Sequence, residues 1–131
     1  MAYYLNTFVK LPFDAAIERV KEELKKQGFG VLTEIDVRET LKKKIGVEFR
    51  NYRILGACNP PFAHRALLAE DKIGVLLPCN VTVQEHVGGK VEVAAVDPLV
   101  SMQAVGNPAL AVIAGEIQAR LKSVIAGLAG A

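Results

Sequence analysis

Two amphipathic helices, one near each end of the chain, each carry a single apolar stripe. In both segments large apolar residues recur at every third or fourth position, which places them on one face of a helix. The stripes consist of Phe13, Ile17, Val20 and Leu24, and of Ile113, Ile117, Leu121, Val124 and Leu128. A helix with one apolar stripe must cover another apolar surface, so both helices are predicted to pack on a shared partner layer.

Strand-like segments between the two helices supply that layer. The predicted strands are residues 3–9, 31–37, 52–58, 73–77, 80–87 and 90–96. The last two flank Gly88-Gly89, which predicts a hairpin with a two-residue type I′ or II′ turn, because such turns need positive φ. Val81, Val83, Val91 and Val93 are the expected inward row of this hairpin. Residues 38–44 and 62–69 are predicted to be short helices.

The order of elements favours an α+β, two-layer sandwich, with a mainly antiparallel sheet and two long helices on one face. The other sheet face is then exposed or covered by a partner subunit. Asp97-Pro98 and Asn107-Pro108 each have the pattern of an N-cap followed by proline at the first helical position. The length of 131 residues fits one domain, residues 1–131.

A repeated dipeptide marks the candidate site. The segments 53–57 and 73–78 lead into Cys58-Asn59 and Cys79-Asn80, which contain the only two cysteines. The intervening helix favours a crossover between parallel neighbours, which would bring both thiols to one edge of the sheet. Ligand sites form at such strand ends in open α/β layers.

Composition excludes several classes of protein. A formal net charge of +2, with 6% aromatic residues, gives no indication of a nucleic-acid partner. No apolar run is long enough to cross a bilayer, and the first residues lack the pattern of a signal peptide. We therefore expect a cytoplasmic protein, in which two cysteines are reduced thiols.

The best-supported reading from the residues is a small-molecule ligand site formed by Cys58, Asn59, His64, Cys79 and Asn80. Phe62 and Leu77 would provide apolar walls, and the two asparagines polar specificity. A thiol redox or sulfur-transfer protein using Cys58 or Cys79 is the alternative from another class, and a structural dimerisation module is the third. A zinc site from the cysteines, His64 and His86 is not predicted, because their spacing fits no known pattern. The residues indicate no particular cofactor and no particular reaction.

The segments Ile54-Leu55-Gly56-Ala57-Cys58-Asn59-Pro60 and Leu76-Leu77-Pro78-Cys79-Asn80-Val81, with Val96-Asp97-Pro98 downstream, resemble the bacterial and archaeal family called domain of unknown function 302. The resemblance extends over nearly the whole chain. It implies a compact α+β sandwich similar to the TATA-binding protein, assembled as a homodimer. It implies no activity and assigns no catalytic residue, and a fold shared with a DNA-binding protein does not predict DNA binding.

Overall fold

The computed structural model describes residues 2–131, and its centre is an antiparallel sheet of five strands in the order β1-β5-β4-β3-β2. The strands are β1 (Tyr4–Val9), β2 (Gly30–Asp36), β3 (Tyr52–Cys58), β4 (Cys79–Glu85) and β5 (Val91–Val96). The helices are α1 (Phe13–Lys26), α2 (Val37–Ile45), α3 (Pro60–Ala69), α4 (Pro98–Ser101) and α5 (Pro108–Leu128). Two short 3₁₀ helices, η1 (Ile73–Leu76) and η2 (Gln103–Val105), complete the described chain.

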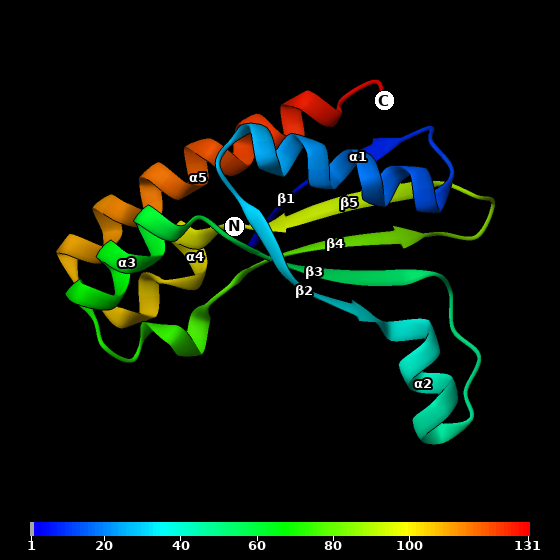
Figure 1. The fold of residues 1–131 in the computed structure, drawn as a ribbon, viewed down its shortest axis with the longest axis horizontal. Coiled ribbons are helices and arrows are strands. Elements are labelled where there is room, and N and C mark those ends of the chain that lie inside the picture. Colours follow the sequence, from blue (N-terminus) through cyan, green and yellow to red (C-terminus); the bar gives the residue numbers. More distant parts are fainter. Residues whose placement is uncertain (1) are drawn as a thin grey trace.

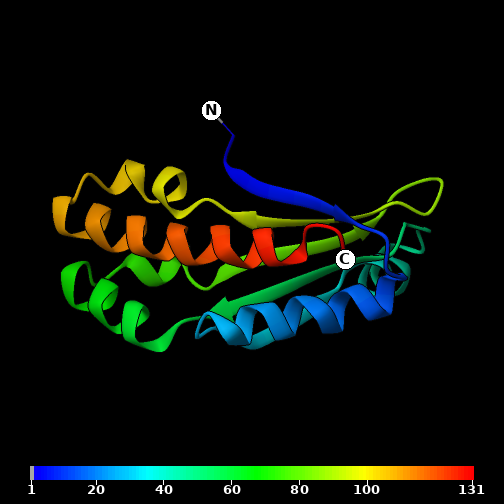
Figure 2. The ribbon, with the colours of Figure 1, turned by 90° about the horizontal axis from the view of Figure 1, so that it is seen from above.

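Helices α1 and α5 lie side by side over one face of the sheet (Figures 1 and 2). All the predicted stripe residues of both helices are buried, as is the predicted inward row of β4 and β5. The core therefore fills the space between these two helices and one sheet face. The predicted two-layer α+β architecture, with a mainly antiparallel sheet and two long helices on one face, is confirmed.

The end of α1 shows how local sequence sets the path of the chain. Gly28 has a φ of 85° and donates its N–H to the Lys25 carbonyl, while the Phe29 N–H bonds the Leu24 carbonyl. This pair of hydrogen bonds is a Schellman motif, in which the residue after the glycine packs back onto the last turn. Phe29 is buried accordingly, and it becomes one wall of the site described below.

Both predicted N-caps are present. The Asp97 Oδ1 accepts the Leu99 N–H at 3.1 Å, and the Asn107 Oδ1 accepts the Ala109 N–H at 3.0 Å. The β4–β5 hairpin is also present, but its connection is longer than two residues. The hydrogen bond from the Gly89 N–H to the His86 carbonyl makes Val87 and Gly88 the central turn residues. The second glycine, with a φ of 87°, then redirects the chain into β5.

The predicted strand 73–77 is wrong. Residues 73–76 form the 3₁₀ helix η1, in which Ile73 is buried and Val75 is 84% exposed. The parallel pairing predicted between this segment and residues 52–58 is therefore also wrong, because β3 pairs instead with the antiparallel β4. The apolar run 73–77 is too short for its periodicity to distinguish a strand from a single helical turn.

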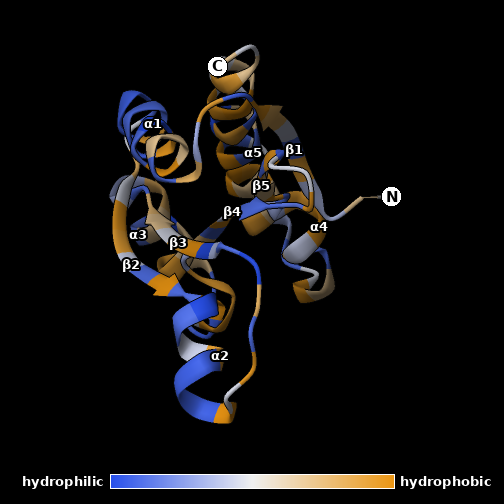
Figure 3. Ribbon diagram, turned by 90° about the vertical axis from the view of Figure 1, so that its right-hand side faces the viewer, coloured by the Kyte–Doolittle hydropathy of each residue, from blue (hydrophilic) through white to orange (hydrophobic). Residues whose placement is uncertain are grey.

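Two parts of the molecule lie outside the two layers. Helix α2 buries no side chain, is largely hydrophilic and projects away from the sheet (Figures 1 and 3). At the opposite end, α3 and α4 flank the first half of α5 on either side (Figure 2). Within residues 2–131, every helix is too short or too polar to span a membrane.

Candidate functional site

The two cysteines lie at the same end of the sheet, although for a different reason from the predicted one. Strand β3 ends at Cys58 and β4 begins at Cys79, and Ala57 is the direct antiparallel partner of Cys79. Both thiols are free. The connection through α3 and η1 brings the chain back to the end of the sheet where β3 finishes, and the antiparallel β4 begins there. A parallel strand would have finished at that same end, so either arrangement brings the two thiols together.

A cavity of about 290 Å³ opens at this point, and we call it the cysteine pocket. It lies between the end of the sheet, α3, η1 and α5, and its surface is almost entirely apolar. The pocket is lined by Phe29, Leu32, Ala57, Cys58, Asn59, Phe62, Ala63, Leu67, Gly74, Leu77, Pro78, Cys79 and Ile117. Phe62 and Leu77, the apolar walls expected from the sequence, are both among these residues.

Asn59 lines the pocket, and its side chain also connects two of the elements around the pocket. Its side-chain Nδ2 donates to the Gln27 carbonyl at 3.1 Å, which ties the start of α3 to the end of α1. Gly28 allows this contact, because a Cβ there would lie 3.2 Å from the Asn59 Nδ2. No group among residues 2–131 donates a hydrogen bond to the Asn59 Oδ1. The amide oxygen is thus an unused acceptor on a residue that lines an otherwise apolar pocket.

The other two predicted site residues lie elsewhere. Side chains alternate between faces along a strand, so the inward Cys79 forces Asn80 onto the opposite sheet face, where it lines a separate cavity. His64 is exposed on α3 and does not line the cysteine pocket. Ala66 is the buried residue of α3, and a position two residues away lies on the far side of a helix.

Two arginines lie against the aromatic wall of the pocket. The Arg65 guanidinium bonds Glu116 at 2.7 Å, and the Arg120 guanidinium donates to the Gln27 carbonyl at 3.4 Å. The Arg65 and Arg120 guanidinium carbons lie 5.5 and 5.7 Å from the centre of the Phe62 ring. Contacts of this kind between a cation and an aromatic face are attractive, so they hold the ring that forms one pocket wall.

Burial dominates the chemistry of Cys79. It raises the pKa of the Cys79 thiol to about 11, and the neighbouring Cys58 adds to the shift. A thiolate is the nucleophile and the metal ligand, so a thiol held protonated is a poor attacking group. Among residues 2–131, no group of three or more His, Cys, Asp or Glu side chains is arranged to hold a metal ion. The pocket is therefore better suited to holding a ligand than to attacking one through Cys79.

Several pocket residues were not anticipated from the sequence, including Phe29, Leu32, Gly74, Pro78 and Ile117. Phe29 has a signal that could have been used, since an apolar residue after a helix-ending glycine packs back onto the helix. Ile117 belongs to the stripe of α5, and periodicity alone cannot separate a stripe residue at a pocket from one in the core.

Known proteins share this architecture. The family described as "Domain of unknown function DUF302" matches residues 5–128. The crystal structure of an uncharacterized conserved DUF302 protein from Bacillus stearothermophilus superposes with a TM-score of 0.91 at 32% sequence identity, covering 98% of this chain and 99% of that one. No curated protein matches the chain. The chain therefore belongs to the family of domains of unknown function DUF302.

Proposed function

We propose that this protein binds a small, largely apolar molecule in the cysteine pocket. The observation that carries the proposal is that both free cysteines and Asn59 line one apolar cavity of about 290 Å³. Ligand pockets are typically apolar clefts with a few polar groups that fix the orientation of the ligand. The unused Oδ1 of Asn59 supplies one such group, and the two sulfurs supply polarizable contacts.

The size of the cavity limits the ligand. An apolar cavity of about 150 Å³ holds benzene, so a cavity of about 290 Å³ accommodates a molecule of roughly the size of indole. A ligand with an N–H or O–H group could donate to the Asn59 Oδ1 while its ring contacts Phe29 and Phe62. The size of the cavity and the single acceptor of Asn59 together favour compact aromatic or short-chain molecules that carry one hydrogen-bond donor.

We expect indole to bind the protein and Gly74→Leu to weaken its binding about ten-fold or more, because the new side chain occupies the pocket. Gly74 lines the pocket, and a Cβ added there meets no atom within 4 Å. The dissociation constant is measured by NMR titration, in which the amide signals of β3, η1 and α5 that surround the pocket shift with ligand.

Gly115→Leu is the matched control, because a Cβ at Gly115 also meets no atom within 4 Å and this residue does not line the cysteine pocket. It should bind indole as the unmodified protein does. Equal weakening by both leucines, or indole shifts that map away from the pocket, would contradict the proposal.

The uncovered sheet face supports a second proposal, a homodimer. Tyr4, Phe8 and Ile35 are 40%, 45% and 47% exposed on the described chain. The strand register aligns one row across the middle of the sheet, consisting of Asn6, Ala94, Thr82, Ile54 and Ile35. This row is uncharged, so a second copy of the chain can pack against it in a two-fold contact without like-charge repulsion.

We expect light scattering to give twice the 14.1 kDa mass of one chain. Thr82→Lys should raise the dimer dissociation constant about a hundred-fold or more, because the contact would bury two unpaired charges. Ser123→Lys places the same charge on the exposed surface of α5 and should leave the mass unchanged. A monomer at millimolar concentration of the unmodified protein would rule out the dimer.

A further inference from the structure

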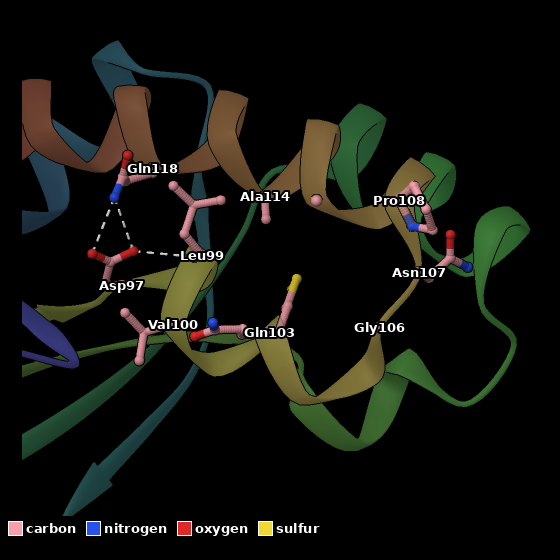
Figure 4. A pocket seen from close by; sticks show the side chains of 11 residues that line it. Asp97, Leu99, Val100, Gln103, Gly106, Asn107, Pro108, Ala114 and Gln118 are labelled. Carbon is pink, nitrogen blue, oxygen red and sulfur yellow. Dashed lines mark hydrogen bonds between the residues drawn. The ribbon is translucent and has the colours of Figure 1, made fainter. Parts of the chain in front are cut away.

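Another cavity, larger than the cysteine pocket, lies on the other side of α5. It has a volume of about 510 Å³ and is bordered by α4, η2 and the first half of α5. Asp97 and Gln118 form one end, and Asn107 and Pro108 form the other (Figure 4). Between the ends, its walls are mostly apolar and include Leu99, Val100, Met102 and Ala114. We call this space the Asp97 cavity.

Asp97 is a buried acid without a counter-charge. The residue is 8% exposed, and its carboxylate accepts the Leu99 N–H and the side-chain amide of Gln118. No lysine, arginine or histidine among residues 2–131 forms an ion pair with it. Burying a carboxylate away from water is costly unless a cation or several hydrogen bonds compensate. The groups of the described chain that donate hydrogen bonds to the Asp97 carboxylate are therefore all neutral.

The role of Asp97 as the N-cap of α4 does not explain why a charged residue stands at this position. Asn107 caps the first turn of α5 with the same geometry, also before a proline, and it does so with a neutral amide. Asparagine and aspartate are about equally good N-caps. The negative charge at position 97 is therefore additional to what the fold requires, and it is at the cavity end where a ligand could use it.

The Gln118 side-chain amide holds the Asp97 carboxylate in place at the end of the cavity. Its Nε2 lies 3.1 and 3.0 Å from the two Asp97 oxygens, and since a carboxylate can only accept, this nitrogen must face Asp97. Figure 4 shows the Gln118 Oε1 on the side of the amide away from Asp97. The end of the cavity therefore presents one negative charge, held by neutral donors, next to an apolar channel.

We propose that the Asp97 cavity binds a small organic cation, a primary ammonium or guanidinium group carried on an aliphatic chain. The cation would pair with the Asp97 carboxylate, while its aliphatic chain contacts Leu99, Met102 and Ala114. This site is independent of the cysteine pocket, which contains no charged side chain.

The test uses n-hexylammonium as the probe and the neutral n-hexanol as its control, both titrated by NMR into the full chain. We expect n-hexylammonium to move the Gln118 side-chain amide signal and to bind about ten-fold or more weakly to Asp97→Asn, since a charged hydrogen bond is lost. Hexanol should bind both proteins equally. An unchanged affinity for n-hexylammonium in Asp97→Asn would overturn the proposal.

Ala111→Phe provides a second variant that keeps the carboxylate. Ala111 is exposed and lines the cavity, so a phenyl ring there should fill the channel and abolish binding of n-hexylammonium. Undiminished binding in Ala111→Phe would overturn the proposal even if Asp97→Asn fails to fold.

An acetylated Gly-Lys-Gly amide carries the same ammonium on a peptide. If it bound as tightly as n-hexylammonium, the cation would come from a protein and the small-molecule assignment would be wrong.

Discussion

Cys79 of the folded protein is expected to react with iodoacetamide at pH 8 about a hundred-fold more slowly than Cys79 of the unfolded chain. Burial, with Cys58 nearby, raises the pKa of this thiol from 9.0 to about 11. The thiolate fraction at pH 8 then falls from about 9% to about 0.1%, and the thiolate is the reactive species. The rates are measured by mass spectrometry of the Cys79 peptide, with and without guanidinium chloride.

Burial also blocks access to the sulfur, and the pH profile separates the two effects. If the pKa is raised, the alkylation rate of folded Cys79 keeps increasing up to pH 11, whereas simple blocking slows the reaction without moving its midpoint from pH 9. The Cys58 peptide from the same digest is the internal control, because Cys58 is only half-buried. A midpoint near 9 for Cys79 in the folded chain would show that desolvation does not control this thiol.

This result bears on the choice between a ligand site and thiol chemistry. A redox or sulfur-transfer mechanism that starts from Cys79 needs a thiolate near neutral pH, and the buried, apolar surroundings oppose it. The same surroundings favour an apolar ligand, because its transfer from water into the pocket is favourable. The features that suppress reactivity at Cys79 are therefore those that support binding in the cysteine pocket.

The layers of the fold could be predicted because their signals are periodic. The stripe of Ile117 and its neighbours, and the alternation of Val81 and Val83, each determine which side chains face the core. The apolar run that begins at Ile73 has no such periodicity, since it is a single 3₁₀ turn. Its misassignment also produced the wrong parallel pairing.

The candidate site was predictable only in part. Cys58, Asn59 and Cys79 line the cysteine pocket, but Asn80 does not, because treating Cys-Asn as a unit ignores the alternation of side chains along β4. The Asp97 cavity was not found from the sequence. The pattern Asp97-Pro98 predicts a cap correctly, but the burial of that carboxylate depends on Gln118, which is 21 residues away. Contacts of this range follow from tertiary packing and have no local signal.

Gly56→Ala is expected to lower the free energy of unfolding by about 1–3 kcal/mol, the usual cost of overpacking. Gly56 is buried in β3, where β2 and β3 shift register between Val31 and Thr33. A Cβ at this position would overlap the Thr33 Oγ1 and lie 2.9 Å from the Pro78 Cγ. A threonine can change its rotamer, but the proline ring cannot move away without moving the wall of the cysteine pocket. Urea denaturation followed by circular dichroism measures the loss.

Two further variants show whether steric overlap is the cause. Gly30→Ala changes another β-strand glycine, where a Cβ meets no atom within 4 Å, and its effect should stay within about 0.5 kcal/mol. In a Thr33→Ala background the penalty of Gly56→Ala should shrink without disappearing, because the Pro78 contact remains. Equal effects of Gly56→Ala and Gly30→Ala would mean that glycine flexibility, rather than close approach, accounts for the loss. A penalty that vanishes completely in the Thr33→Ala background would mean that Pro78 yields readily, and the pocket wall beside it would then be adaptable rather than fixed.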